Sequence, residues 1–559
     1  MRCSPLLVAG VTWLLIGCQS PGEATPPAGF PMEPNPASTG VTPPGEQPGV
    51  CEAAPKPPSP IALLTRTQYD NTVEDLLGDT TRPSTTFPAE NQVEGFRNNV
   101  YAHQASPLLV EMFQGAAESI AARAVSTRLD TLAPCAAGAD AVACGRSFVR
   151  SFGMRAFRRP LLDDEAQIFD GLFERSLANE GYAGAVELVL TAMLQSPQFL
   201  YRIDSIGTPT PETGAVAFGP YEMASRLSYF LTGSMPDAEL FEAAAANRLA
   251  TDEEIETQAR RLIATPRARQ MVREFHHQWL RLDNLPALMR TASELGAGST
   301  ELGRDWLASL DAFVDHVYWE AGNASALFTS KRVYVTPRLA VLYETSASAN
   351  GLTAVELPDR AGLITQPALL ALLAHPDQSA PVLRGVFVRE RLMCLPVPPP
   401  PPTVNNMPPD PDPNATTRER FRVHTESDEC RACHQLIDGV GFGLEAYDQL
   451  GRYRSEENGL PVDVSGEVFG TGDPELDGVY SGAGELAARL AGSRRVADCI
   501  ATSWYQYAVG RTPAEADACS LAQVTAAFER SKGDLRELLV AVTLTDGFRY
   551  RAPLPEEAP

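Results

Sequence analysis

Apolar side chains recur every three or four residues along most of this chain, which is the spacing of an amphipathic helix. The spacing predicts a helix over residues 65–77, ended by Gly78, because glycine is favoured just after the last helical turn. A second predicted helix begins after Thr251, with Ile255 and Leu262 on its buried face. The pattern therefore predicts a mainly α-helical protein.

Two segments depart from the helical pattern. Alternating apolar and polar positions are clearest over residues 462–479, where glycines provide turn points, and they predict a small β-hairpin. Residues 395–414 are rich in proline, and the five consecutive prolines 398–402 favour an extended polyproline II conformation. This segment is either a stiff spacer between a helical body and a C-terminal module or a strap packed along the body.

The string Cys430-Arg431-Ala432-Cys433-His434 is the strongest chemical signal in the chain. The pattern C-x-x-C-H is the attachment site of a covalent haem c, in which two cysteine sulfurs bond to the porphyrin and the histidine ligates iron. In an exported chain the two cysteines could instead form a disulfide or contribute to a zinc site. We expect a helix over this string, with Cys430, Cys433 and His434 as the cofactor-binding residues.

The sixth position on the iron is open to several interpretations. No methionine follows Met407 and no histidine follows His434, so the nearby candidates are His424 and Met407. A bis-histidine iron has a lower reduction potential than a His/Met iron. A vacant position, which would permit peroxide or oxygen chemistry, and a distant ligand are the remaining alternatives. Gly439, Gly441 and Gly443 follow the motif, and we expect them to let backbone pass close to the flat macrocycle.

The N-terminal residues are typical of an export signal. Arg2 precedes a short apolar run, and residues 15–18 (LIGC) have the form of a bacterial lipobox. We expect residues 1–17 to be a signal peptide and Cys18 to carry a lipid that anchors the chain to a membrane. Gln19 favours the outer membrane in the lipoprotein sorting pattern. An ordinary signal peptide cut nearby is the alternative.

The overall charge limits the classes of partner. The formal net charge of −24 repels nucleic acid, so we expect no nucleic-acid partner.

Residues 18–60 are rich in Pro, Gly, Ala, Thr and Ser, and they predict an extended tether that buries no core. Beyond the signal, no apolar segment is long enough to predict a transmembrane helix.

The ten cysteines divide by their expected roles. Cys3 would leave with the signal, Cys18 would take lipid, and two cysteines belong to the haem motif. The remaining six suit three disulfides outside the reducing cytoplasm. Local spacing suggests the first two of the pairs below and leaves Cys51 with Cys394, although six cysteines allow fifteen pairings. The suggested pairs are Cys135–Cys144, Cys499–Cys519 and Cys51–Cys394.

Several longer stretches resemble a family of large secreted multi-domain proteins from planctomycetes and myxobacteria. The stretches are residues 64–72 (LTRTQYDNT), 155–161 (RAFRRPL), 196–202 (SPQFLYR), 224–231 (ASRLSYFL), 360–363 (RAGL) and 507–511 (YAVGR). The resemblance covers roughly residues 60–551, and its part from residue 360 through Cys430–His434 resembles a cytochrome c-type domain. It implies haem and a multi-domain architecture, but no particular reaction.

The expected domain order follows from these segments. It comprises a signal peptide (1–17), a tether (18–60), an N-terminal helical domain (61–145), a helical connecting domain (146–210), a central helical domain (211–350), a cytochrome c-like domain with the proline-rich strap (351–460) and a C-terminal helical domain (461–559).

The sequence favours one-electron transfer by a lipid-anchored envelope protein, with a redox protein as its partner. A haem enzyme of the peroxidase or oxygenase kind is one alternative. A non-redox surface-binding protein with a Cys430–Cys433 disulfide is the other. The motifs G-x-S-x-G, H-E-x-x-H and the P-loop are absent from the sequence, so we predict no catalytic residue.

Overall fold

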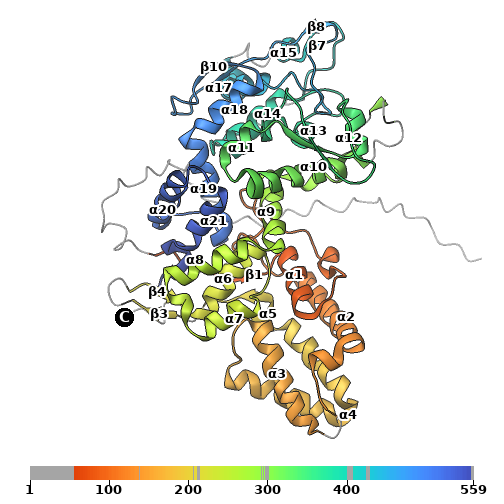
Figure 1. Cartoon of the computed structure of the whole chain (residues 1–559), viewed down its shortest axis with the longest axis vertical. Coiled ribbons are helices and arrows are strands. Elements are labelled where there is room, and N and C mark those ends of the chain that lie inside the picture. The colour runs from red at the N-terminus through yellow and green to blue at the C-terminus, as the bar shows by residue number, and fades with distance from the viewer. Residues whose placement is uncertain are drawn as a thin grey trace, which may run out of the picture. The chain divides into compact units, whose positions relative to one another are not determined.

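Helices make up most of the described chain, and its strands are short (Figure 1). The computed structural model describes residues 56–136, 139–204, 207–210, 214–290, 292–293, 295, 301–399, 407–422 and 428–554. These residues belong to one compact unit, Pro43–Pro559. The prediction of a mainly α-helical protein is confirmed.

The first helices pack around a hydrophobic core of their own, which includes Phe148 and Phe173. They are α1 (Arg66–Leu77), α2 (Pro107–Leu132), α3 (Ala141–Phe157), α4 (Asp163–Gln195) and α5 (Pro197–Leu200), with the 3-10 turn η1 (Pro83–Thr86). The side chain of Thr65 caps α1, and Gly78 ends it in the left-handed conformation. The helix predicted over residues 65–77 is therefore confirmed.

The central helices build a second, larger core. They are α6 (Pro220–Thr232), α7 (Ala238–Ala245), α8 (Asp252–Ile263), α9 (Pro266–Trp279), α10 (Leu302–His316), α11 (Ala324–Thr329), α12 (Pro337–Leu342) and α13 (Pro367–Leu372). Short turns of other helical types connect them, namely η2 (Arg248–Ala250), η3 (Leu282–Asn284), η5 (Val317–Ala321) and η6 (Leu363–Thr365). Thr251 caps α8, and Ile255 and Leu262 are buried as predicted.

The last helices, apart from α15, complete the same larger core. They are α14 (Pro381–Phe387), α15 (Thr417–Phe421), α17 (Asp428–Phe442), α18 (Gly482–Gly492), α19 (Arg494–Val509), α20 (Ala518–Arg530), α21 (Leu535–Thr543) and α22 (Asp546–Arg549), with the turns η7 (Val388–Leu392) and η8 (Glu515–Asp517). Helix α14 packs directly against α17. The chain before the proline-rich segment therefore contacts the chain after it, which favours the strap over a spacer between separate bodies.

Short antiparallel sheets connect distant parts of the chain. The paired strands are β1 (Ala62–Leu63) with β2 (Tyr201–Arg202), β4 (Val216–Phe218) with both β3 (Gly207–Pro209) and β11 (Tyr550–Arg551), β5 (Arg332–Val335) with β6 (Thr353–Glu356), β7 (Glu456–Glu457) with β8 (Leu460–Pro461), and β9 (Ser465–Val468) with β10 (Gly478–Ser481). The β9–β10 pair corresponds to the hairpin predicted over residues 462–479. Because β11 pairs with β4, the end of the described chain is tied to its middle.

The prediction that no transmembrane helix follows the signal peptide is tested only in the described ranges. None of the helices there is both long enough and apolar enough to cross a bilayer. Residues 1–55, which include the predicted signal peptide and Cys18, lie outside the described residues.

The disulfides correct part of the predicted pairing. Cys135 and Cys144 are bonded, as predicted. Cys394 is bonded to Cys499, so the predicted pairs Cys499–Cys519 and Cys51–Cys394 are wrong. Cys519 is disulfide-bonded as well, whereas Cys51 lies outside the described residues. The long-range pair arises because helix α19 packs against the turn η7 that precedes Cys394, a contact that spacing along the chain does not reveal.

One buried carboxyl group makes the stability of this fold depend on pH. Glu222 of α6 is 6% exposed, and burial raises its pKa from 4.5 to about 7. The folded chain therefore binds this proton more tightly than the unfolded chain does, and stability falls as the pH rises from about 4.5 through about 7. The difference between the two pKa values corresponds to about 3 kcal/mol.

Glu222→Gln should remove this dependence. We expect the variant to exceed the wild type in free energy of unfolding by about 3 kcal/mol at pH 8 and to match it at pH 4. Urea denaturation at the two pH values measures the difference, and Glu253→Gln, at an exposed position of α8, is the matched control. An equal effect of Glu222→Gln at both pH values would show that the proton on Glu222 does not matter.

Candidate functional site

Helix α17 carries the predicted haem-attachment string in its first half. Cys430, Cys433 and His434 are all half-buried, and Cys433 is a free thiol. Residues three and four positions apart lie on the same face of a helix. The helix thus presents the two sulfurs and the imidazole on one side, as attachment to a single macrocycle requires. The predicted helix over this string is confirmed.

The imidazole of His434 is held by a carboxylate on the next turn of α17. Nδ1 of His434 lies 2.9 Å from Oδ1 and 3.0 Å from Oδ2 of Asp438, so the Nδ1–H group donates to the carboxylate. Asp438 is itself only 3% exposed. A buried carboxylate on Nδ1 fixes the tautomer and the orientation of a histidine, and it makes Nε2 the nitrogen that would bind a metal.

The glycines after the motif have a different role from the one predicted. A Cβ atom at Gly441 would overlap the carbonyl oxygen of Pro381 at the start of α14, and one at Gly385 of α14 would overlap that of Ile437. The two helix backbones therefore approach each other closely. On the hairpin side, the Tyr480 hydroxyl donates to the carbonyl oxygen of Val440 at 2.8 Å. The prediction that these glycines face a macrocycle is wrong, since protein backbone and Tyr480 occupy that space.

The turn after β9 approaches the middle of α17. Arg389 of η7 donates to the carbonyl oxygen of Phe469 at 2.9 Å and to that of Gly470 at 3.3 Å. A Cβ atom on Gly470 would lie 3.5 Å from Cδ2 of Leu436. The side chain of Phe469 is 47% exposed. The turn that carries the exposed ring of Phe469 thus contacts α17 at Leu436, which is two residues after His434.

A fully buried arginine holds the chain that leaves α17. Arg384 of α14 is 0% exposed and donates to the carbonyl oxygens of Leu444 at 3.0 Å, Tyr447 at 2.8 Å and Asp448 at 2.9 Å. Its nearest carboxylate is Glu445, at 3.5 Å. Burial raises the pKa of the Glu445 carboxyl, while Arg384 and Arg454 oppose that shift. Residues 444–448 are therefore fixed to α14 through one side chain.

The other predicted ligands are not tested by the structure. His424 lies outside the described residues, and Met407 is 67% exposed. The described residues contain no group of three or more His, Cys, Asp or Glu side chains placed to hold a metal ion. His424 and Met407 therefore stay predictions for the sixth position on the iron.

Five family models match the chain one after another. They are described as proteins of unknown function and match residues 63–126 (DUF1587), 144–204 (DUF1595), 218–345 (DUF1592), 360–457 (DUF1588) and 478–548 (DUF1585). The match over 360–457, which contains α17, is to the model named PSCyt3, a cytochrome-like name. The matches fit the planctomycete multi-domain family. No curated protein and no solved structure matches the chain.

The segment matched by the PSCyt3 model therefore includes every residue predicted to hold haem. Sequence reasoning identified Cys430, Cys433 and His434 but missed Asp438. The available signal was its position four residues after His434, which places both side chains on one helix face. Arg384 gave no such signal, because its partners lie about 60 residues further along the chain.

Proposed function

We propose that this chain is a lipid-anchored envelope protein that binds one covalent haem c and transfers single electrons. The observation that carries the proposal is the placement of Cys430, Cys433 and His434 on one face of α17, with His434 held by buried Asp438. The cytochrome-like match over residues 360–457 supports it. A haem c supplies a one-electron Fe(III)/Fe(II) couple.

The residues of α17 divide the work of holding such a group. Each thiol would add across a vinyl group of the porphyrin, which leaves a thioether and needs no oxidant. His434 would present Nε2 to the iron while its Nδ1–H group donates to Asp438. Further along the same helix, α14 and Tyr480 pack closely against residues 437–443 and leave no room for a macrocycle there. Phe469, exposed on the turn beside α17, would offer an apolar contact near the porphyrin edge.

The location at the envelope is supported by the sequence alone. The apolar run before Cys18 and the lipobox form of residues 15–18 favour export and lipid attachment. Gln19 favours the outer membrane, and the acidic net charge suits a cationic redox partner.

Reversible redox behaviour tests the proposed function against its rivals. The full chain, produced with a haem c maturation system, should show a one-electron couple in spectroelectrochemical titration and should not turn over hydrogen peroxide. Rapid peroxide turnover with a high-spin spectrum would favour a haem enzyme instead. Colourless protein would favour a non-redox surface protein, although Cys433 is a free thiol and not part of the disulfide expected in that case.

Asp438→Asn should raise the reduction potential of the haem. A carboxylate on Nδ1 increases electron donation by the imidazole and stabilises Fe(III), and an amide does so less. If the carboxylate stabilises Fe(III) over Fe(II) by a factor of ten, its loss raises the potential of this one-electron couple by about 60 mV. Asp463→Asn, at an exposed carboxylate before β9, is the control and should leave the potential unchanged. An unshifted potential in Asp438→Asn would show that this hydrogen bond does not tune the iron.

A further inference from the structure

A polar cavity of about 830 Å³ opens on the cytochrome-like segment, and none of its lining residues belongs to the haem-attachment string. We propose that this cavity binds a neutral sugar chain. The proposal goes beyond electron transfer and does not depend on haem. The volume of the cavity lies within the range of about 300–1,000 Å³ that is typical of small-molecule sites.

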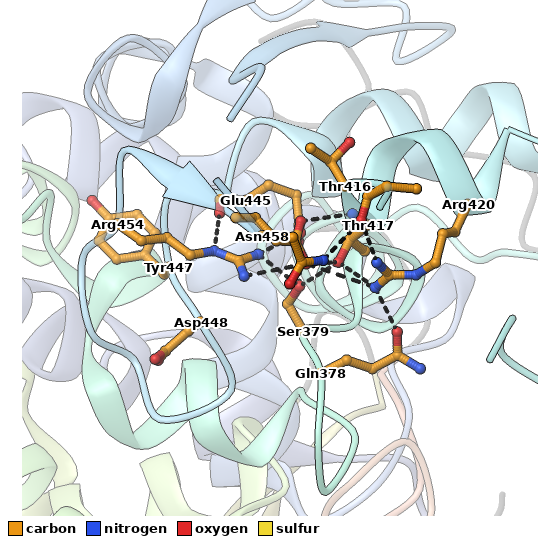
Figure 2. Close-up of polar contacts among 12 residues, drawn as sticks. Gln378, Ser379, Thr416, Thr417, Arg420, Glu445, Tyr447, Asp448, Arg454 and Asn458 are labelled. Atoms are coloured by element: carbon orange, nitrogen blue, oxygen red, sulfur yellow. Dashed lines mark hydrogen bonds and ion pairs between the residues drawn. The ribbon is translucent and has the colours of Figure 1, made fainter. Parts of the chain in front are cut away.

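The floor of the cavity is made of polar side chains that hold one another in place (Figure 2). Arg420 of α15 donates from Nη2 to Gln378 Oε1 at 2.9 Å and to Thr417 Oγ1 at 2.9 Å. The carboxylate of Glu457 accepts from the Thr417 hydroxyl at 2.7 Å and lies 3.6 Å from Arg420. The side chain of Arg420 is 6% exposed. A floor of this kind is pre-organised, so a ligand would not have to order it.

Further polar contacts hold this network in place (Figure 2). Arg454 donates to Glu445 Oε2 at 3.1 Å and to the Glu445 carbonyl oxygen at 3.0 Å, and it also lies 3.3 Å from Glu457. The Ser379 hydroxyl donates to Glu445 Oε2 at 2.7 Å. Because Glu445 is 2% exposed, these ion pairs are shielded from water. The floor thus offers hydrogen-bonding groups whose charges are already compensated.

The charges around the cavity select against acidic ligands. Four arginines and seven carboxylates line it, which leaves an excess of negative charge. The exposed acids of this lining are Glu344, Asp377, Asp412 and Glu456. They would repel a polyanion such as an acidic polysaccharide or nucleic acid.

An exposed aromatic ring completes the features of a sugar site. Tyr453 lines the cavity and is 57% exposed. Its ring packs edge-on against Tyr447 at 5.9 Å between centroids, which limits its motion. Sugar rings present apolar C–H faces that pack on aromatic side chains, and hydroxyl groups that bond to fixed polar groups. Tyr453 and the pre-organised polar side chains of the same cavity offer both kinds of contact.

Calorimetric titration with defined sugars tests this proposal. The full chain would be titrated with six-unit fragments of cellulose, xylan, mannan and chitin, and with a polygalacturonate fragment as the acidic comparison. We expect at least one neutral fragment to bind and the acidic fragment to bind more weakly. Tyr453→Ala should weaken that binding by about tenfold, as expected for loss of an aromatic contact. Tyr101→Ala removes a similarly exposed tyrosine that is distant from Tyr453 in the sequence, and it should leave the sugar affinity unchanged.

The outcomes separate this site from the haem site. The Cys430→Ala/Cys433→Ala variant should keep its sugar affinity, and Tyr453→Ala should keep its haem spectrum. Lack of binding by every neutral fragment at millimolar concentration would overturn the proposal. Preference for the acidic fragment, or unchanged affinity in Tyr453→Ala, would overturn it as well.

Discussion

Replacing Arg384 by alanine should lower the free energy of unfolding by about 3–5 kcal/mol, the cost of removing one partner from a buried ion pair. Arg384 is completely buried, so its removal leaves the buried Glu445 carboxylate with less charge compensation. It also leaves the carbonyl oxygens of Tyr447 and Asp448 without this donor. Each buried polar group that loses its partner adds to the cost.

Urea denaturation of Arg384→Ala measures this effect, with Arg150→Ala as the matched control. Arg150 also pairs with a carboxylate, that of Asp170 at 3.0 Å, but its side chain is 55% exposed. An exposed pair contributes about 1 kcal/mol or less, so the control should remain close to wild type. A loss below about 1 kcal/mol in Arg384→Ala would show that residues 444–448 do not depend on this side chain.

Replacing both Cys430 and Cys433 by alanine should abolish covalent haem attachment. Two cysteine sulfurs of α17 would form thioethers, so Cys433→Ala alone should weaken the haem signal, because one sulfur remains. The double variant should show none on a denaturing gel stained for haem peroxidase activity. Removing the other short-range cysteine pair, Cys135 and Cys144, is the matched control and should leave the stain unchanged. Equal staining of wild type and double variant would refute attachment at these positions.

Local signals in the sequence predicted much of the fold. The starts of α1 and α8 follow from Thr65 and Thr251, since each caps its helix with its own side chain. The helix that carries the haem-attachment string followed from local spacing in the same way. Caps and helix faces depend on neighbours within about four residues, which a single sequence displays directly.

Long-range partners were beyond this kind of reasoning. The Cys394–Cys499 bond joins residues 105 positions apart, and spacing favoured the shorter Cys499–Cys519 pair instead. Gly441 was assigned to a macrocycle because nothing in the sequence places Pro381 against it. The polar cavity combines residues from 342 to 458 that share no motif. Such contacts depend on how the helices pack, which apolar periodicity does not specify.

A pyridine haemochrome spectrum of the denatured full chain tests the central claim most directly. The chain would be produced with a haem c maturation system, extracted with acidified acetone to remove loosely bound haem, and then measured. Our account predicts one haem c per chain that stays with the polypeptide after extraction. A colourless chain, or haem that passes entirely into the acetone, would contradict it.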